Sequence, residues 1–188
     1  MPTIDVECAE LERLLGWTWQ GDMDKLDWLL AFVKSEVKLY NEQEGIVSVE
    51  LKDTNRPDLW GVEGLARALR GFLNLEKGPR RYEVNEPILD VHVAPQLSTI
   101  RPFICCSVVK NVKLTDAVIR GLMHLQDKLD QTYGRNRQKT SIGIYNYNLI
   151  SPPLKYNVAK PADISFVPLG FEEKMNLAEI LERHPKGV

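Results

Sequence analysis

The chain has 188 residues, of which 44% are hydrophobic and 27% are charged, and its formal net charge is −2. These values are typical of a globular protein with one domain or two small ones. No run of about 18 apolar residues is present, which excludes a membrane-spanning helix, and the near-neutral charge argues against a protein that coats nucleic acid. The first residues lack the basic and then apolar pattern of a secretory signal, so we expect a cytoplasmic protein.

The two halves of the chain differ in charge. Residues 1–93 carry 11 Lys and Arg against 18 Asp and Glu, whereas residues 94–188 carry 13 against 8. The first half is therefore net negative and the second net positive. If either half contacts an anion, this distribution favours the second.

Two helices are predicted at the start of the chain. Apolar residues at helical spacing indicate a helix over residues 4–16, ended by Gly16, and a second one over residues 22–34, capped by Asp22. Two short helices joined by a glycine-containing connection could also form a nucleic-acid-binding helix-turn-helix. Acidic side chains along both helices would repel phosphate, so we favour a structural role.

A hairpin and a third helix follow. Residues 35–41 and 46–52 alternate between apolar and polar side chains, which predicts a β-hairpin. The stretch 55–73 then begins as a turn, because Pro57 suits a first helical turn and Asp58 is a capping residue. Apolar residues recur behind them at helical spacing and predict a well-packed helix.

The second half combines strands and helices after a charged linker at residues 76–83. Residues 103–109 form a nearly continuous apolar run, as expected for a strand buried on both faces. The predicted fold class is therefore α+β. The other elements expected here are strands at 88–93, 140–147 and 164–169, a long helix at 115–133 capped by Thr115, and a final helix at 177–183 capped by Asn176.

The three cysteines show no metal-like spacing. Cys105 and Cys106 are adjacent, so in a strand their side chains would point to opposite faces. We therefore expect them, like Cys8, to be buried structural thiols in a reducing cytosol.

A basic loop is the best candidate for a binding site. Arg135, Arg137 and Lys139 follow the end of the long helix, and Gln126 lies two turns earlier at the edge of its apolar face. An amide and guanidinium groups placed in this way could orient a carboxylate, a phosphate or a nucleotide end. The same residues could equally form a solvated turn whose cations stabilise a helix C-terminus.

Other familiar sites are not indicated. The three histidines, His92, His124 and His184, share no metal-ligand spacing. Phosphate-binding loops, dinucleotide-binding glycine patterns and nucleophile elbows are missing from the sequence. We therefore expect no cofactor or metal bound to this chain, and the residues alone identify no catalytic group.

Five strings resemble the beta subunit of phenylalanyl-tRNA synthetase, in its archaeal and eukaryotic branch. They are NRPDLWGVEGLARAL, RPFICCSVVKNV, LMHLQDKLDQTYGRNRQKTSIGIYNYNLISPPLKY, ISFVPLG and EILERHPKG, in the order and spacing of that family. The resemblance covers nearly the whole chain.

The resemblance implies a class II aminoacyl-tRNA synthetase, a phenylalanine–tRNA ligase that works as an α2β2 complex. Such a complex uses ATP and magnesium, and its alpha subunit carries the synthetic site. Its beta subunit carries an editing domain that hydrolyses tyrosine wrongly attached to tRNA(Phe), because a Phe pocket rejects an added hydroxyl only weakly. The expected partners are therefore the alpha subunit and tRNA(Phe).

By the same resemblance, residues 1–85 correspond to the structural first domain and residues 86–188 to the opening, incomplete portion of the editing domain. Gln126, Arg135 and Arg137 match the region of the editing pocket. The rest of that pocket and the magnesium-binding carboxylates would lie downstream. We therefore expect an N-terminal fragment that is inactive alone and prone to self-association.

Two other functions remain open. The chain could be a structural or interaction module without chemistry of its own. It could also be a stand-alone factor that edits mischarged tRNA, although its pattern ends inside a continuing domain.

Overall fold

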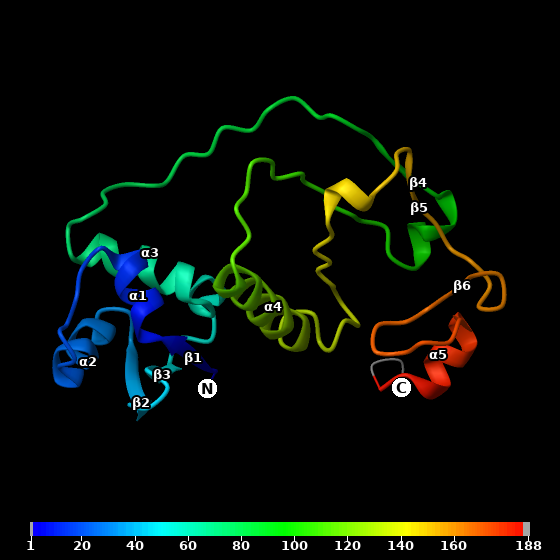
Figure 1. Ribbon diagram of the computed structural model, residues 1–188. Coiled ribbons are helices and arrows are strands. Elements are labelled where there is room, and N and C mark those ends of the chain that lie inside the picture. The colour runs from blue at the N-terminus through cyan, green and yellow to red at the C-terminus, as the bar shows by residue number, and fades with distance from the viewer. Residues whose placement is uncertain (1, 186–188) are drawn as a thin grey trace. The chain divides into compact units, whose positions relative to one another are not determined.

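The computed structural model describes residues 2–185 and divides into two compact units (Figure 1). The first unit combines the residues up to Glu83 with Asn111–Tyr145. The second combines Val84–Lys110 with the residues from Asn146 onward. Each unit is thus built from two separate stretches of chain.

A three-stranded antiparallel sheet forms one side of the first unit. Its strands are β1 (Thr3–Glu7), β2 (Ser35–Asn41) and β3 (Ile46–Leu51), and β3 lies in the middle. Ile4 pairs with Val49 and Val6 with Val47, which places buried side chains from neighbouring strands on one face. Strand β2 pairs antiparallel with β3, which confirms the predicted hairpin.

Three helices cover that apolar face (Figure 1). They are α1 (Cys8–Leu15), α2 (Met23–Ala31) and α3 (Val62–Phe72), and α1 packs directly against α3. The Asp22 carboxylate accepts a hydrogen bond from the Lys25 amide and caps α2, as predicted. The core side chains contributed by the helices are Leu11, Leu15, Leu26, Leu29, Leu30, Leu65, Ala66 and Leu69.

The prediction of one helix over residues 4–16 is wrong in its first part. Residues Thr3–Glu7 form β1, and only Cys8–Leu15 are helical. Ile4 and Val6 alternate with acidic residues, a period-two pattern that is satisfied by pairing with β3. Gly16 ends the helix in the left-handed conformation, as expected.

The third helix begins later than predicted. Pro57–Leu59 form a separate 3₁₀ turn, and α3 starts only after Gly61. The Asp58 carboxylate does not cap the helix, because it pairs with the Arg56 guanidinium instead. Gly64 makes this arrangement possible, since a Cβ at that position would overlap the carbonyl oxygen of Asp58.

Helix α4 (Asp116–Gln131) belongs to the first unit. The Thr115 hydroxyl accepts a hydrogen bond from the Val118 amide and caps the helix, which confirms the prediction. Leu125 and Leu129 pack against the core of the unit. The predicted division into domains at residues 1–85 and 86–188 stays a prediction, because compactness alone does not define the domains of a family.

The second unit contains small pieces of sheet and one short helix. Strand β4 (Val91–Val93) pairs in parallel with β5 (Leu154–Tyr156), and β6 (Ser165–Phe166) pairs with β7 (Met175–Asn176). Helix α5 (Leu177–Arg183) is capped by Asn176, as predicted, and the Glu179 side chain completes a capping box with it. Two 3₁₀ turns complete the unit, at Pro95–Thr99 and Tyr147–Leu149.

The buried strand predicted at residues 103–109 is not formed. These residues are extended but unpaired, and Phe103 is 91% exposed. Residues 140–147 likewise form no strand, and the strand expected at 88–93 is reduced to its last three residues. A strand needs neighbours for its N–H and C=O groups, and within residues 2–185 neither residues 103–109 nor residues 140–147 pair with a strand.

The cysteine prediction is also wrong in part. Cys8 is half-buried, but Cys105 and Cys106 are both exposed because their run lacks a covering layer. Burial raises the pKa of the Cys8 thiol, and the nearby Glu12 carboxylate adds to that shift. Within the described residues, no helix is long and apolar enough to cross a membrane.

Candidate functional site

The predicted basic loop follows α4 in a tight turn that requires glycine. Helix α4 ends at Gln131, and the Gly134 amide then donates to the carbonyl oxygen of Leu129 at 2.9 Å. A Cβ on Gly134 would lie 2.5 Å from the carbonyl oxygens of both Asp130 and Thr140. No larger residue fits there, so the loop starts at a fixed place.

The next three residues adopt the left-handed conformation. The φ angles of Arg135, Asn136 and Arg137 are 48°, 53° and 66°. The backbone is held by hydrogen bonds from the Arg137 amide to the Asp130 carbonyl, at 3.2 Å, and from the Lys139 amide to the Gly134 carbonyl, at 2.8 Å. The loop is therefore a short turn of opposite hand to the helix before it.

Asp130 fixes the far side of this turn. Its side chain is only 3% exposed, and its carboxylate accepts hydrogen bonds from Arg137 Nε at 2.9 Å and from the Ile142 amide at 3.0 Å. Asp127 lies 3.7 Å from another guanidinium nitrogen of Arg137. The Arg137 side chain is thus anchored to α4, which limits how far it can reach toward a ligand.

The other two predicted residues lie in different surroundings. Arg135 is exposed and Gln126 is half-buried on α4. No ion pair connects Arg135 to a carboxylate within the described residues, so its charge is available to solvent. The structure therefore brings Arg137 to Asp130, whereas Arg135 has the more accessible charge. The assignment of all three to a site stays a prediction.

Sequence reasoning missed Asp130. Its one visible signal is electrostatic, because a carboxylate in the last turn of a helix faces the negative end of the helix dipole and is unfavourable without a partner. Burial of the charge makes a partner still more necessary. Arg137, seven residues later, supplies it.

Helix α4 rests on the stretch that carries the first resemblance string. The Leu125 side chain lies within 4 Å of where a Cβ on Gly61 would be, and a Cβ on Gly121 would lie 2.8 Å from the Glu63 carboxylate. Trp60 packs against Tyr133, with ring centroids 5.6 Å apart. These small residues let α4 approach the start of α3 closely, and they fix the base of the basic loop.

His124 lies on the same helix. Its Nε2 atom is buried without a hydrogen-bond partner in the described structure. Burial lowers the pKa of His124, and the positive charge of Lys128 lowers it further, against the opposing effect of Asp5 and Asp127. The imidazole is therefore held neutral at physiological pH, which suits a packing role.

Metal-ligating side chains do not gather within the described residues. Among residues 2–185, no group of three or more His, Cys, Asp or Glu side chains could hold a metal ion. The sequence has no phosphate-binding loop.

Similarity to known proteins extends over the whole chain. It is 41% identical to the phenylalanine–tRNA ligase beta subunits of Thermococcus onnurineus and Pyrococcus furiosus, and covers 32% and 34% of them. A solved N-terminal fragment of the phenylalanyl-tRNA synthetase beta subunit from Pyrococcus horikoshii matches 99% of the chain with a TM-score of 0.92 and 37% identity. The chain covers 53% of that fragment and about a third of the curated relatives. No family model matches the sequence.

Proposed function

Because the chain is related over its whole length to phenylalanine–tRNA ligase beta subunits, we propose that it works as part of such a subunit. In this proposal the complete beta subunit joins an alpha subunit in the cytoplasm and charges tRNA(Phe), with ATP and magnesium held elsewhere in the complex. The observation that carries the proposal is whole-chain identity of about 40% together with the agreement in fold.

We further propose that the region from α4 to the basic loop contributes to hydrolysis of mischarged tyrosyl-tRNA. Arg135 would contact the tRNA end or the amino acid through its exposed guanidinium, and Gln126 would face the same region from α4. Arg137 would act as a positioning residue, because its side chain is tied to Asp130. This assignment is supported by a rigid basic turn on a well-packed helix.

The test compares two samples for hydrolysis of tyrosyl-tRNA. One is the chain alone, and the other is the assembled complex whose beta subunit contains this sequence. We expect hydrolysis by the complex and none by the chain alone, because the chain spans only part of its relatives. A complex that charges phenylalanine but leaves tyrosyl-tRNA intact would refute the editing part alone.

Variants of the complex sharpen the test. Arg135→Ala should slow tyrosyl-tRNA hydrolysis about 10-fold or more while Phe-tRNA synthesis is preserved. Arg137→Ala should do the same, and Arg137→Lys should restore part of the rate if positioning by Asp130 is its role. Lys38→Gln serves as the control, because Lys38 is an exposed lysine on β2, about 90 or more residues before the basic loop in sequence. Unchanged hydrolysis in Arg135→Ala would show that Arg135 is not part of the site.

A second candidate is an interaction module without chemistry. It is favoured by the apolar side chains that the second unit leaves exposed, among them Phe103 and Leu169. Rapid hydrolysis of tyrosyl-tRNA by the chain alone would refute this reading and support a stand-alone editing factor.

A further inference from the structure

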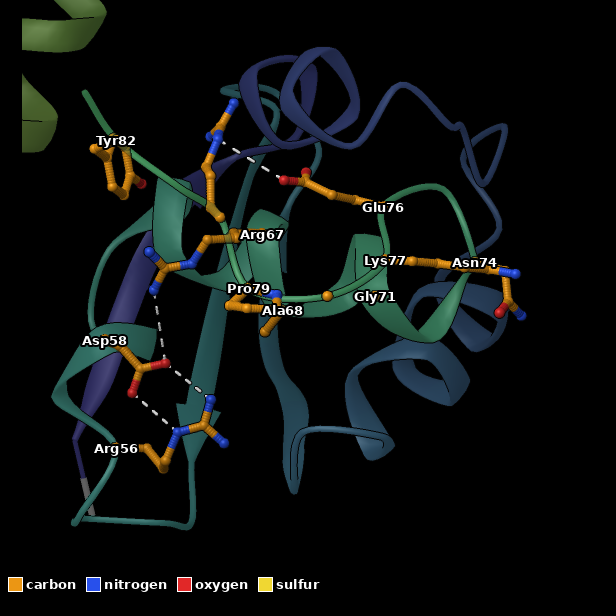
Figure 2. Close-up of a pocket in the computed structure, with 12 residues that line it drawn as sticks. Arg56, Asp58, Arg67, Ala68, Gly71, Asn74, Glu76, Lys77, Pro79 and Tyr82 are labelled. Carbon is orange, nitrogen blue, oxygen red and sulfur yellow. Dashed lines mark hydrogen bonds and ion pairs between the residues drawn. The ribbon is translucent and has the colours of Figure 1, made fainter.

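A hollow of about 560 Å³ lies on the first unit, between α3 and the segment that follows it (Figure 2). Every residue that lines it falls within residues 56–82, far along the chain from the basic loop. This segment carries six Lys and Arg against three Asp and Glu, inside a half of the chain that is otherwise strongly acidic. The lining residues are Arg56, Asp58, Arg67, Ala68, Gly71, Asn74, residues 76–80 and Tyr82.

One wall holds two guanidinium groups around a single carboxylate. Arg56 binds Asp58 through two hydrogen bonds, of 2.9 Å and 2.8 Å, and Arg67 Nη2 lies 4.0 Å from the same carboxylate. The Arg56 hydrogen bonds hold the pKa of Asp58 below its ordinary value, so this carboxylate stays ionised. Two guanidinium groups around one carboxylate leave this wall with a net positive charge.

Two guanidinium groups also surround Glu76, and of these two only Arg80 lines the hollow. Glu76 accepts a hydrogen bond from Arg70 Nε at 3.1 Å and lies 3.8 Å from Arg80 Nε. Arg70 also donates to the carbonyl oxygen of Leu15 at 2.7 Å, which ties the Arg70 side chain to the end of α1. Lys77 also lines the hollow, on the side of Asn74, and has no carboxylate partner within the described residues (Figure 2). The hollow therefore carries more positive than negative charge.

The floor is made of small residues. Ala68 and Gly71 face the hollow from α3, and a Cβ added at Gly71 would meet no atom within 4 Å. At the rim stands Tyr82, whose side chain is 69% exposed, and Figure 2 shows its ring on the same side of the hollow as Arg67. An anion held by the cations would thus lie beside an accessible aromatic face.

We propose that this hollow binds a phosphate group of a single-stranded RNA segment, with a base stacked on Tyr82. Guanidinium groups bind phosphate and carboxylate alike, so charge alone would also suit an acidic peptide. The exposed aromatic ring beside the cations favours RNA, because bases stack on such rings while the cations follow the backbone. The choice of RNA rests in part on the proposed function, whereas the anion-binding property rests on the hollow itself.

The test measures binding of the full chain to a fluorescein-labelled single-stranded RNA 12-mer by anisotropy, at several salt concentrations. Arg67→Gln and Lys77→Gln should each raise Kd about tenfold and make the salt dependence less steep, by about 0.7 in the slope for each phosphate that is no longer neutralised. Tyr82→Ala should raise Kd at least about fivefold with an unchanged salt slope. Lys38→Gln, an exposed lysine on β2, is the control and should leave both quantities unchanged.

Gly71→Leu separates binding from folding. A Cβ at this helical position meets no atom within 4 Å, and leucine is a better helix former than glycine. We therefore expect the leucine to occupy the hollow and the protein to be at least as stable as the original. We expect RNA binding to be lost in this variant. Wild-type affinity and salt slope in both Gly71→Leu and Arg67→Gln would overturn the proposal.

Two further outcomes are decisive. RNA binding that is abolished by Arg135→Gln but unaffected by the hollow variants would show that RNA does not bind in the hollow. The proposed function would remain intact. In the second outcome, a polyglutamate peptide binds to the original chain but not to Gly71→Leu, and it displaces no RNA. The hollow would then bind acidic peptides, and the proposal would be overturned. No charging or hydrolysis is measured, so failure here is distinct from failure of the proposed function.

Discussion

The two units of the molecule contain similar apolar residues but bury them very differently. In the first unit, 17 buried hydrophobic residues form one cluster, whereas in the second only Leu97 and Met175 are buried among the residues described. Phe103 and Leu169 of the second unit are 91% and 96% exposed. Apolar residues are therefore present in both units, but they form a core only where β-strands distant in sequence pair with one another.

The reason lies in the strands. In the first unit β3 has a neighbour on each side, and the paired strands present one apolar face that the helices cover. In the second unit the paired strands are two or three residues long and form two separate pieces of sheet. Such short ladders present no continuous face, so nothing fixes a helix or a second layer above them.

The largest difference should appear on truncating a side chain in each unit. Leu65→Ala removes a fully buried side chain and should lower the free energy of unfolding of the first unit by about 2–5 kcal/mol. Phe103→Ala should change it by less than about 0.5 kcal/mol. All four tryptophans lie in the first unit, so urea unfolding followed by their fluorescence reports this unit directly. Equal effects of the two variants would contradict the comparison.

A second pair of variants tests close packing at the start of α3. Gly64→Ala should destabilise the first unit by about 1–3 kcal/mol, because the new methyl group overlaps the Asp58 carbonyl oxygen. Gly71→Ala lies in the same helix with open space around it, and should stabilise the protein by about 0.5–1 kcal/mol. The same urea titration measures both, and a neutral Gly64→Ala would show that the 3₁₀ turn can shift.

A third variant concerns the turn after α4. Asp130→Asn keeps an acceptor for the Ile142 amide but removes the charge that pairs with Arg137. It should lower the free energy of local opening of this turn by about 1–2 kcal/mol. Amide hydrogen exchange should accelerate around residues 134–142 in this variant. Asp127→Asn, which removes a more distant and exposed partner of Arg137, should leave the exchange unchanged.

The exposed side chains of the second unit should cause self-association. Light scattering should show the mean mass of the chain rising with concentration, because exposed apolar surface and unpaired strand edges associate. Replacing Phe103 and Leu169 by serine should reduce the rise, with little change in the unfolding of the first unit. A monomer at every concentration would count against this prediction.

The smallest expected effect is a pH dependence from His124. Burial lowers its pKa below the ordinary value of 6.5, so the unfolded chain takes up a proton before the folded protein does. Stability should therefore decrease as the pH falls below about 6.5, down to the lower pKa of the folded state. His124→Gln should remove this part of the decrease, as measured by urea midpoints at pH 7.5 and 5.5. An identical decrease in the variant would show that other groups cause it.

Local patterns allowed much of the fold to be predicted from sequence. Helices α2, α4 and α5 follow from caps at Asp22, Thr115 and Asn176, since each cap is a contact between residues three apart. The hairpin follows from alternation around a turn. The strand at Thr3–Glu7 was missed because its short alternating pattern runs directly into a helical one, and its partner β3 lies about 40 residues later in the chain.

The candidate sites show the same limit. The basic loop was visible as a run of cations after a helix, but the burial of Asp130 and its bond to Arg137 depend on the backbone reversing direction at Gly134. The hollow beside α3 was hidden by the net negative charge of its half of the chain. Only a narrower window, over residues 56–82, shows the local excess of positive charge.

The left-handed turn at residues 135–137 has a consequence for amino-acid choice. Backbone preference alone would place glycine or asparagine at all three positions, because a Cβ is unfavourable there by about 1 kcal/mol each. The middle position follows that preference with Asn136, but both flanking positions carry arginine. Local conformation does not account for either arginine. Arg137 is held in its conformation by Asp130, whereas the exposed Arg135 has no such contact within the described residues, which makes it the residue of the turn to test first.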